Sequence, residues 1–436
     1  MSSFRTVLVR DSTLGDLTDD IDYAVQSGAS QCTFQQFPTT SASNSAVIWN
    51  VQVPSENVII GRDVLINTGL TFRLNLGSAT DATKQVAVGD AAMEIGSTDS
   101  LHAFPLNSLF TTATAQINNT TVSCNVQDVL PSLLRMNNSR ELYAANSTTA
   151  SFPDQAYGEY ADAVGALNNP MAAYNTTIIT EPLFLSPFIF GDGEFNKQGF
   201  LGINNMSFTF NIDSEAKRLW STANNYVTSI ALGSAANPNG FNYQPQATGG
   251  AILQTPPANP QMLFKFLSSQ PSDLIASKNI VPYMDFPRYL TSSANAAALA
   301  SGATSLLTSS NIQINQIPDL FIINIRKPMA TQDSSDADAF FKINNISINL
   351  NNQSGLLSSS TPYDLWKMSV RNGSTQTWSE FSGQSQVTSA TGVVTKAVTT
   401  GSLLIINPAY DLSLPDYISS GSLGNYNFQF NVGVTN

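Results

Sequence analysis

Hydrophobic and polar residues alternate in short segments along most of the chain, and the clearest segment occurs twice. Residues 203–211 read INNMSFTFN and residues 343–351 read INNISINLN. Each combines a polar Ile-Asn-Asn turn with the two-residue period of a strand that has one buried face. The turn alone also occurs at residues 117–119. The similarity predicts one β-unit used twice, and hence two similar β-domains in tandem; chance in an Asn-rich chain is the alternative.

Other segments with the two-residue period predict strands in both halves of the chain. Residues 181–189, EPLFLSPFI, are apolar but contain two prolines, so we expect an edge strand or a loop-like strand there. Many short strands separated by turn residues favour a sandwich or a barrel over alternating βαβ units. The remaining segments with a strand pattern are 46–53, 58–66, 70–76, 116–126, 206–212, 261–267, 319–326, 339–349, 402–406 and 425–434.

A few segments have the 3.6-residue period of a helix instead. The first segment, 12–27, predicts a short amphipathic helix in an N-terminal arm. The second segment, 126–136, contains Pro131, so a helix there would be kinked or would begin late. The third would be capped by Asp213 and would bury Leu219 and Trp220. An Ala- and Ser-rich stretch, 294–307, fits either a helix or a loop. The three helical segments are 12–27, 126–136 and 213–223.

A polar stretch rich in Gly, Pro, Asn and Gln, residues 233–262, separates the two runs of strands. Such a composition is typical of a linker or a large surface loop. The length of 436 residues suits about two to three ordinary domains. We therefore predict an N-terminal arm or helix at 1–30, a first β-domain at 31–235, a linker or surface loop at 236–260, and a second β-domain at 261–436.

Composition narrows the possible surfaces of these domains. Charged residues make up only 11% of the chain, against about 25% in typical soluble proteins. The polar surface must therefore consist of Asn, Ser, Thr and Gln. Such a surface suits burial against neighbouring subunits, because interface cores are depleted of charge. A neutral extracellular β-protein is the alternative, and composition does not separate the two.

The charge pattern disfavours direct binding of nucleic acid. The formal net charge is −12, and the first thirty residues contain only the cations Arg5 and Arg10. No signal peptide is recognisable at the start, and no window approaches the roughly 20 apolar residues of a membrane span. Two cysteines, Cys32 and Cys124, are too few for a disulfide framework. We expect folding in a reducing cytosol, in which the N-x-S/T sequons remain by-products of the composition.

Residues with catalytic or metal-binding chemistry are sparse. His102 is the only histidine and precedes an apolar segment, which favours a packing role over a catalytic one. A Ser-His-Asp triad cannot be assembled around it, and a Cys-His nucleophile would need Cys32 or Cys124. The zinc-ligand spacings CxxC and HxxxH are absent. The sequence therefore predicts no catalytic residue, no metal ligand and no cofactor.

Two groups of carboxylates are the remaining candidates for chemistry. Asp19, Asp20 and Asp22 lie on the polar side of the predicted N-terminal helix, and Asp192 and Glu194 flank a glycine in GDGEF. Paired acids can hydrolyse glycosides or bind calcium. Asp-Gly is foremost a turn dipeptide, however, so the motif favours a turn. A β-rich hydrolase that uses Asp192 and Glu194 is the least favoured hypothesis.

Two tryptophans, Trp366 and Trp378, bracket the segment YDLWKMSVRNGSTQTWSEF. The pair Asn372-Gly373 between them predicts a hairpin turn that joins two strands. Exposed tryptophans can stack on carbohydrate rings. Burial in the core or at a subunit contact is the favoured interpretation, because aromatic side chains contribute most of their energy when they are buried.

Several longer phrases resemble the double jelly-roll major capsid proteins of virophages, Polinton-like viruses, large eukaryotic DNA viruses and tailless membrane-containing phages, a lineage shared with adenovirus. The resemblance implies an all-β fold class, with two tandem eight-stranded jelly-roll sandwiches and short helices in the connecting loops. The two predicted β-domains would be the two jelly rolls. The phrases lie at Asp99–Asn119, Glu181–Phe195, Gln316–Pro328, Phe340–Gly383 and in the ending GNYNFQFNVGVTN.

The resemblance also implies a function. The chain would be a major capsid protein that trimerises into pseudo-hexameric capsomers, tiles an icosahedral virus shell, and is not an enzyme. It would be made in the host cytoplasm and reside in the virion. Its implied partners are copies of itself, minor capsid and penton proteins, and an internal membrane reached through residues 1–30, without direct contact to nucleic acid. The alternative is a β-sandwich carbohydrate-binding or fibre/attachment protein.

Overall fold

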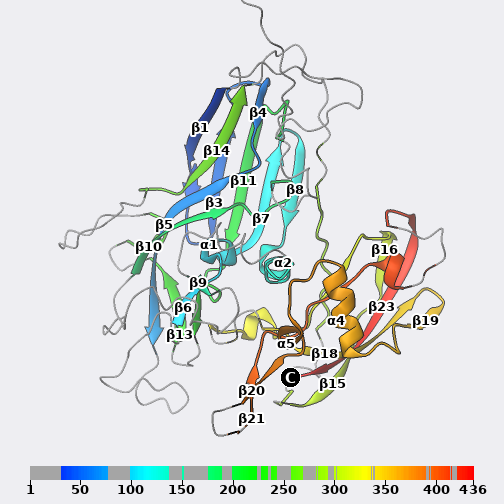
Figure 1. Ribbon diagram of the computed structural model, residues 1–436. Coiled ribbons are helices and arrows are strands. Elements are labelled where there is room, and N and C mark those ends of the chain that lie inside the picture. Colours follow the sequence, from blue (N-terminus) through cyan, green and yellow to red (C-terminus); the bar gives the residue numbers. More distant parts are fainter. Residues whose placement is uncertain are drawn as a thin grey trace, which may run out of the picture. The chain divides into compact units, whose positions relative to one another are not determined.

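The structure is a computed structural model of the 436-residue chain (Figure 1). Helices in the described residues are all too short or too polar to cross a bilayer. The predicted helix at 12–27 lies outside those residues. The structure describes residues 31–76, 99–136, 150–151, 175–188, 199–222, 227–233, 237–242, 257–268, 281, 283–292, 299–300, 302–334, 336, 339–388, 392, 394–412, 414 and 420–436.

The described residues form two compact units. Of the described residues, unit 1 comprises those up to Val129, Ala150 and those from 175 to 286, and unit 2 comprises residues 130–136, Ser151 and those from Pro287 to Asn436. Both units are built mainly of antiparallel strands, so the predicted all-β fold class is confirmed.

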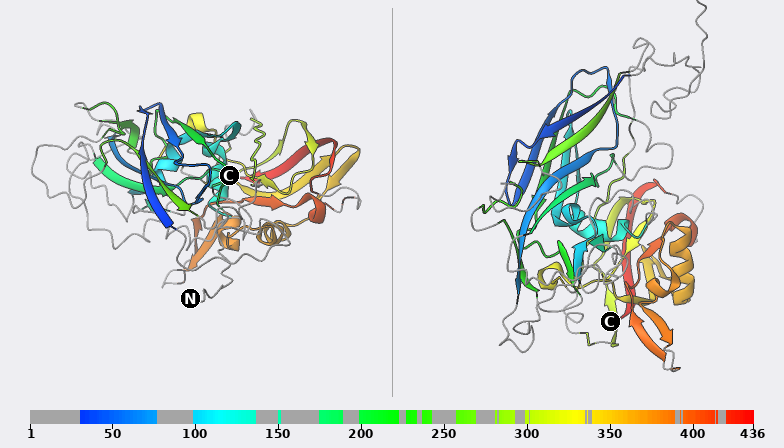
Figure 2. Two further views of the ribbon diagram at one scale, coloured as in Figure 1. Left: turned by 90° about the horizontal axis from the view of Figure 1, so that it is seen from above. Right: turned by 60° about the vertical axis from the view of Figure 1, so that its left-hand side comes forward.

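Unit 1 is a sandwich of two sheets (Figures 1 and 2), built on eight main strands. One sheet has the order β1-β14-β5-β10 and the other β3-β11-β7-β8. In chain order these are strands 1-8-3-6 and 2-7-4-5, the interleaved arrangement of a jelly roll. The strands are β1 (Gln31–Pro38), β3 (Ala46–Gln52), β5 (Leu65–Leu76), β7 (Phe110–Ile117), β8 (Thr120–Cys124), β10 (Asn175–Pro182), β11 (Asn205–Ile212) and β14 (Gln261–Ser268).

Smaller elements extend these sheets. β2 (Ser41–Ala42) pairs with β3, β4 (Val58–Ile60) with β14, and β13 (Val227–Leu232) with β5. A separate sheet has the order β12-β6-β9. Its strands are β6 (Asp99–His102), β9 (Ala150–Ser151) and β12 (Trp220–Thr222). The helices α1 (Pro105–Leu109) and α2 (Val126–Leu133) lie in the same described part of the chain.

Alternation along the strands forms the core of unit 1. Phe208 and Phe210 of β11 are fully buried, while Thr209 between them is only partly buried. The Phe210 ring lies 4.6 Å from the Phe110 ring and 5.5 Å from the Trp49 ring. Burying each large apolar side chain contributes about 1.5–3 kcal/mol. The strand at 206–212 was predicted from this period and is confirmed.

Unit 2 contains a five-stranded sheet with the path β15-β23-β18-β19, to which β16 is added through β23, and two smaller pairs, β17-β22 and β20-β21. Its strands are β15 (Thr304–Thr308), β16 (Ile312–Gln316), β17 (Phe321–Ile323), β18 (Lys342–Leu350), β19 (Gln353–Leu356), β20 (Gln384–Thr388), β21 (Val394–Val398), β22 (Leu404–Ile406) and β23 (Leu423–Thr435). Its helices are η4 (Met329–Thr331), α4 (Pro362–Arg371), α5 (Trp378–Phe381) and α6 (Pro408–Asp411).

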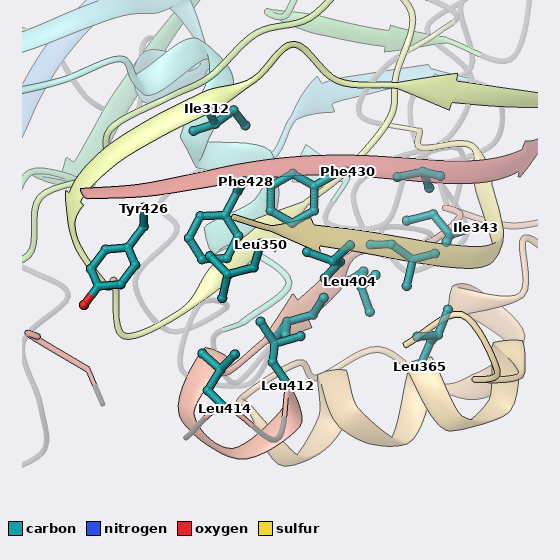
Figure 3. Close-up of a cluster of buried hydrophobic side chains, with 14 of the residues drawn as sticks. Ile312, Ile343, Leu350, Leu365, Leu404, Leu412, Leu414, Tyr426, Phe428 and Phe430 are labelled. Carbon is teal, nitrogen blue, oxygen red and sulfur yellow. The ribbon is translucent and has the colours of Figure 1, made fainter. Parts of the chain in front are cut away.

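The core of unit 2 lies between the large sheet and the elements that cover it. Phe428 of β23, Leu350 of β18, Leu404 of β22 and Leu365 of α4 are all buried and point toward one interior (Figure 3). α4 takes part because Leu365 and Ser369, four residues apart, share its inner face. The helix therefore packs against β18 and β22 as a cover over the sheet.

The two copies of the repeated phrase are both strands, but they are not equivalent strands. β11 is the next-to-last main strand of unit 1 and pairs with β3 and β7. β18 pairs with β23, the last strand of unit 2. In unit 1 the last strand, β14, pairs with β5, so β5 is the counterpart of β18. The interpretation of one β-unit used twice is therefore wrong, because a local pattern does not encode the partner of a strand.

The position of β14 also differs from the prediction. We expected the second β-domain to begin at residue 261, but β14 pairs with β1 over its whole length and with β4 and β5. It therefore completes unit 1, and the predicted boundary is too early. Part of the predicted linker belongs to unit 1 as well: Phe241 is buried, and the Gly240 N–H donates to the side chain of Asn44 at 2.8 Å.

Two predicted elements, the helix at 213–223 and the hairpin at Asn372-Gly373, form other structures. Within the predicted helix 213–223, the described residues 213–222 form turns followed by β12. In these turns the Asp213 carboxylate accepts the N–H groups of Glu215 and Lys217 at 3.1 and 3.3 Å. Asp213 thus caps a turn that no helix follows, although Leu219 and Trp220 are buried as expected.

The predicted hairpin at Asn372-Gly373 is instead the end of α4. Gly373 has φ of 104°, a conformation that terminates helices as well as hairpin turns. The segments before and after it are the helices α4 and α5, each with a capping box at its start. The Asn-Gly dipeptide suits both structures, and the helical spacing of Leu365 and Ser369 decides between them.

Further boundaries differ in detail. The segment 116–126 is a hairpin of β7 and β8 followed by α2, and not one strand. α2 forms as predicted and contains Pro131. β10 ends at Pro182, and a loop follows it. The last part of 294–307 is the strand β15, which begins at Thr304.

Candidate functional site

His102 is a buried residue at the end of β6. It is 2% exposed, and its Nδ1 lies 3.2 Å from the carbonyl oxygen of Ala103 and 3.3 Å from the Ser108 Oγ. The Ser108 hydroxyl itself donates to the Ala103 carbonyl at 2.8 Å. A ring held this way against the main chain has no open face for a substrate, which agrees with the packing role that we favoured.

The two cysteines are far from equivalent. Both are free thiols, Cys32 exposed on β1 and Cys124 buried on β8. Burial raises the pKa of the Cys124 thiol to about 12, so this group stays protonated and unreactive at neutral pH. Among the described residues, no cluster of three or more His, Cys, Asp or Glu side chains could hold a metal ion. The carboxylate candidates Asp19, Asp20, Asp22, Asp192 and Glu194 lie outside the described residues.

Glu181 is a buried carboxylate that the sequence did not indicate. Its Oε1 accepts the Leu106 N–H at 3.0 Å, and its Oε2 accepts the N–H and the side-chain amide of Asn107 at 2.9 and 2.7 Å. The group thus ties β10 to the first turn of α1. Burial raises its pKa to about 7, partly offset by these three hydrogen bonds. Because it is fully enclosed, Glu181 acts as a structural cap rather than as an acid available to a substrate.

The tryptophans form one aromatic cluster on unit 2. The ring centres of Tyr363, Trp366 and Trp378 lie 5.2–5.8 Å apart; Trp378 meets the other two edge to face, and Tyr363 is tilted against Trp366. The Lys367 ammonium lies 4.6 Å from the centre of the Trp366 ring and 5.5 Å from that of Tyr363. Trp378 also stacks on the buried Phe381. Protein groups therefore cover part of the ring surface, while Tyr363 and Trp378 stay 49% and 37% exposed, so the cluster lies at the surface of unit 2.

Large apolar side chains are exposed in both units. Such residues are candidates for contacts between subunits when they are numerous on a protein poor in charge. Leu423 and Tyr410 in unit 2 and Phe34 in unit 1 are about three-quarters or more exposed, at 81%, 79% and 75%. Others are Leu65, Tyr283, Met284, Tyr289, Leu290, Leu306, Tyr363, Val370 and Trp378.

Comparison with known families covers nearly the whole chain. The family model described as the Sputnik virophage major capsid protein 1st domain matches residues 2–179 and 176–267. The model of the major capsid protein V20 C-terminal domain matches residues 286–436. The second match begins at residue 286, next to the change from unit 1 to unit 2 between Phe286 and Pro287.

Individual relatives agree with the family models. The putative capsid protein V20 of Sputnik virophage is 27% identical over 97% of this chain and 72% of its own length. Among solved structures, the Sputnik virophage structure has a TM-score of 0.67 at 22% identity and covers 99% of this chain and 87% of that one. The mavirus major capsid protein has a TM-score of 0.64 at 14% identity and covers 92% and 83%.

The strand order of unit 1 and the structural neighbours define a double jelly-roll protein. The chain belongs to the Sputnik virophage major capsid protein family, whose first-domain model matches more than half of it. It is accordingly a capsid-forming structural protein of the virion, and it is not an enzyme. The resemblance noted in the sequence is confirmed, and self-association follows from membership in a capsid family.

Proposed function

We propose that three copies of this chain form a pseudo-hexameric capsomer and that such capsomers tile an icosahedral shell. The fold supports the proposal because each chain supplies two jelly-roll units. Three chains then present six similar units around a closed threefold axis, which stops growth at the trimer. Contacts between trimers complete the shell in a separate step.

The surface chemistry supports the same proposal. Obligate interfaces commonly bury more than about 2,000 Å² and avoid charge at their centres. With 11% charged residues and exposed Leu423, Tyr410 and Phe34, the chain has surface of the required kind.

The remaining partners follow from the same role. We infer contacts with minor capsid and penton proteins and, through residues 1–30, with an internal membrane. The net charge of −12 argues against direct binding of the genome. Synthesis takes place in the host cytoplasm, where Cys124 stays a free thiol.

Light scattering coupled to size exclusion tests the trimer directly. The expected mass is three times the 46.7 kDa of one chain, and negative-stain images should show hexagonal outlines. Native mass spectrometry of the same fractions provides an independent count of the copies. A strict monomer at high protein concentration, with both units folded, would contradict the proposal.

A further inference from the structure

One hollow on unit 2 has a lining of unusual chemistry. Its volume is about 480 Å³, and it lies where β18, β19 and β23 meet the turn before β16. Seven carboxamides and one hydroxyl line it, and none of the described lining residues is charged or apolar. We call it the amide hollow; its residues are Asn311, Asn349, Asn351, Asn352, Gln353, Ser354, Asn427 and Gln429.

The strands hold several of these amides in place. Phe428 and Leu350 are buried (Figure 3), so the two-residue period turns Asn427, Gln429 and Asn349 to the opposite face. The Asn349 amide donates to the Gln429 Oε1 at 3.2 Å and accepts the Gly355 N–H at 3.3 Å.

The turn between β18 and β19 is fixed in the same way. The Asn351 N–H donates to the Asn427 carbonyl at 2.9 Å, and the Asn351 Oδ1 accepts the Asn427 N–H at 2.9 Å. Little conformational entropy remains for a ligand to remove from these residues, which favours binding.

Other amides of the hollow remain available to a ligand. The side chains of Asn311, Asn352, Gln353 and Asn427 are exposed, and within the described part of the chain they make no hydrogen bond to another residue. Each offers an N–H donor and a carbonyl acceptor side by side. The hollow therefore presents paired donors and acceptors without any net charge.

This chemistry selects among possible ligands. Phosphates and other anions need cationic partners, and calcium sites need carboxylates, which the described lining lacks. An apolar ligand needs apolar walls. Neighbouring hydroxyl groups of a sugar each donate and accept a hydrogen bond, as an amide does. We propose that the amide hollow binds a neutral saccharide on a hydroxyl-rich surface.

Binding at one hollow is expected to be weak, because no aromatic ring lines it. A shell carries many copies, and multivalent contact with a glycan-coated surface raises avidity by about 10²- to 10⁴-fold. The inference does not depend on the trimer, so its failure leaves the capsid assignment intact.

Saturation-transfer-difference NMR on the full chain tests the proposal with glucose, galactose, mannose and N-acetylglucosamine. At least one sugar should receive saturation in a concentration-dependent way. Removing one amide in Asn427→Ala or Asn352→Ala should weaken binding about 3- to 10-fold, the effect of one or two neutral hydrogen bonds. Circular dichroism confirms that each variant is folded.

Asn425→Ala is the matched control. Asn425 is exposed on the same strand, but it lies outside the hollow and accepts a hydrogen bond from Gln313 at 2.8 Å. Its loss should leave sugar binding unchanged. If every sugar received the same saturation from the wild type and from all variants, the contact would be non-specific, and this result would overturn the proposal. A smaller assembly mass for Asn427→Ala, without any sugar binding by the wild type, would assign the hollow to a contact between copies and overturn it equally.

Discussion

Asn118 and Asn351 hold a hairpin to its neighbouring strand in the same way in the two units. Each has φ of 50°. The N–H of Asn118 donates to the carbonyl of Asn205 at 3.0 Å, and that of Asn351 to the carbonyl of Asn427 at 2.9 Å. Each Oδ1 accepts an N–H in return, from Asn204 and Asn427, both at 2.9 Å. Asn is suited to both demands, because it tolerates the left-handed backbone and carries a short acceptor.

The first prediction concerns Asn351. Asn351→Ala should destabilise unit 2 by about 2 kcal/mol, of which about 1 comes from the left-handed backbone and about 1 from the lost hydrogen bond. Asn351→Gly should lose only the contribution of the hydrogen bond, because glycine tolerates positive φ. Urea unfolding followed by tryptophan fluorescence measures the change, with Trp366 and Trp378 reporting on unit 2.

Asn352→Ala is the control for this pair. The Asn352 side chain is exposed and makes no hydrogen bond to the described residues, so its loss should change the free energy of unfolding by less than about 0.5 kcal/mol. If Asn351→Gly were as unstable as Asn351→Ala, the backbone conformation would not contribute as argued.

Glu181 should make the stability of unit 1 depend on pH. Its pKa is raised from 4.5 to about 7 in the folded state, so the folded chain holds the proton more tightly than the unfolded chain does. The stabilisation is complete below pH 4.5 and is lost as the pH rises through about 7, with a total of roughly 3 kcal/mol. Calorimetric unfolding between pH 4.5 and 8 should show this decline for unit 1.

Glu181→Gln should remove that slope, because an amide of the same shape does not titrate in this range. The variant is also expected to be less stable at every pH, since one of its two polar atoms is a donor that faces the donors of Leu106 and Asn107. The exposed Glu56→Gln is the matched control and should keep the wild-type slope. An unchanged slope in Glu181→Gln would assign the pH dependence to another group.

Arg62 is a buried cation that should cost stability. It is 5% exposed, and in the described part of the chain its three guanidinium nitrogens have no hydrogen-bond partner. Burial lowers its pKa, and its guanidinium carbon makes a cation–π contact with the Phe200 ring, 5.1 Å from the ring centre. Arg62→Met keeps the length and removes the charge, so we expect a gain of about 1 kcal/mol after the cation–π loss.

Thermal unfolding of Arg62→Met and of the charge-retaining Arg62→Lys measures this effect. The lysine variant should not gain stability, because it keeps a buried cation. A methionine variant less stable than the lysine variant would show that the positive charge itself is stabilising.

Gly401 should tolerate no side chain. Its φ is 87°, and a Cβ there would lie 1.8 Å from the carbonyl oxygen of Phe340. Gly401→Ala must displace the backbone before β18, and we expect a loss above about 4 kcal/mol, in the range reserved for severe core defects. Gly302→Ala is the control, since Gly302 has φ of 76° but nothing within 4 Å of the added carbon. It should cost only about 1 kcal/mol, and equal losses in the two variants, measured by urea unfolding, would contradict the steric argument.

Local patterns predicted those elements whose buried face follows from their own residues. β11 was recognised because apolar residues occupy every second position, and β18 because they do so from Ile346 to Leu350. The same reasoning failed at Asn372-Gly373 and at Asp213, because these residues stabilise a helix end, a hairpin or a turn equally well. Tertiary packing of Leu365 and Trp220 selected the structure that formed.

The candidate sites were less accessible to sequence reasoning. The amide hollow joins Asn311, Asn349 and Asn427, which come from separate strands and turns. Glu181 was not selected because nothing in its local sequence shows that it caps α1, about 75 residues earlier. The amide hollow was indicated only by the composition, in which Asn and Gln replace charged residues.

The sequence by itself determined the all-β class, the neutral polar surface and the family, since these depend on period, composition and shared phrases. Only the tertiary structure decided that β14 closes the first jelly roll, that the two repeated phrases occupy different places, and that the amides of unit 2 converge on one hollow. The physical reason is that strand pairing and burial join residues distant along the chain, and their energies depend on partners that no local window contains.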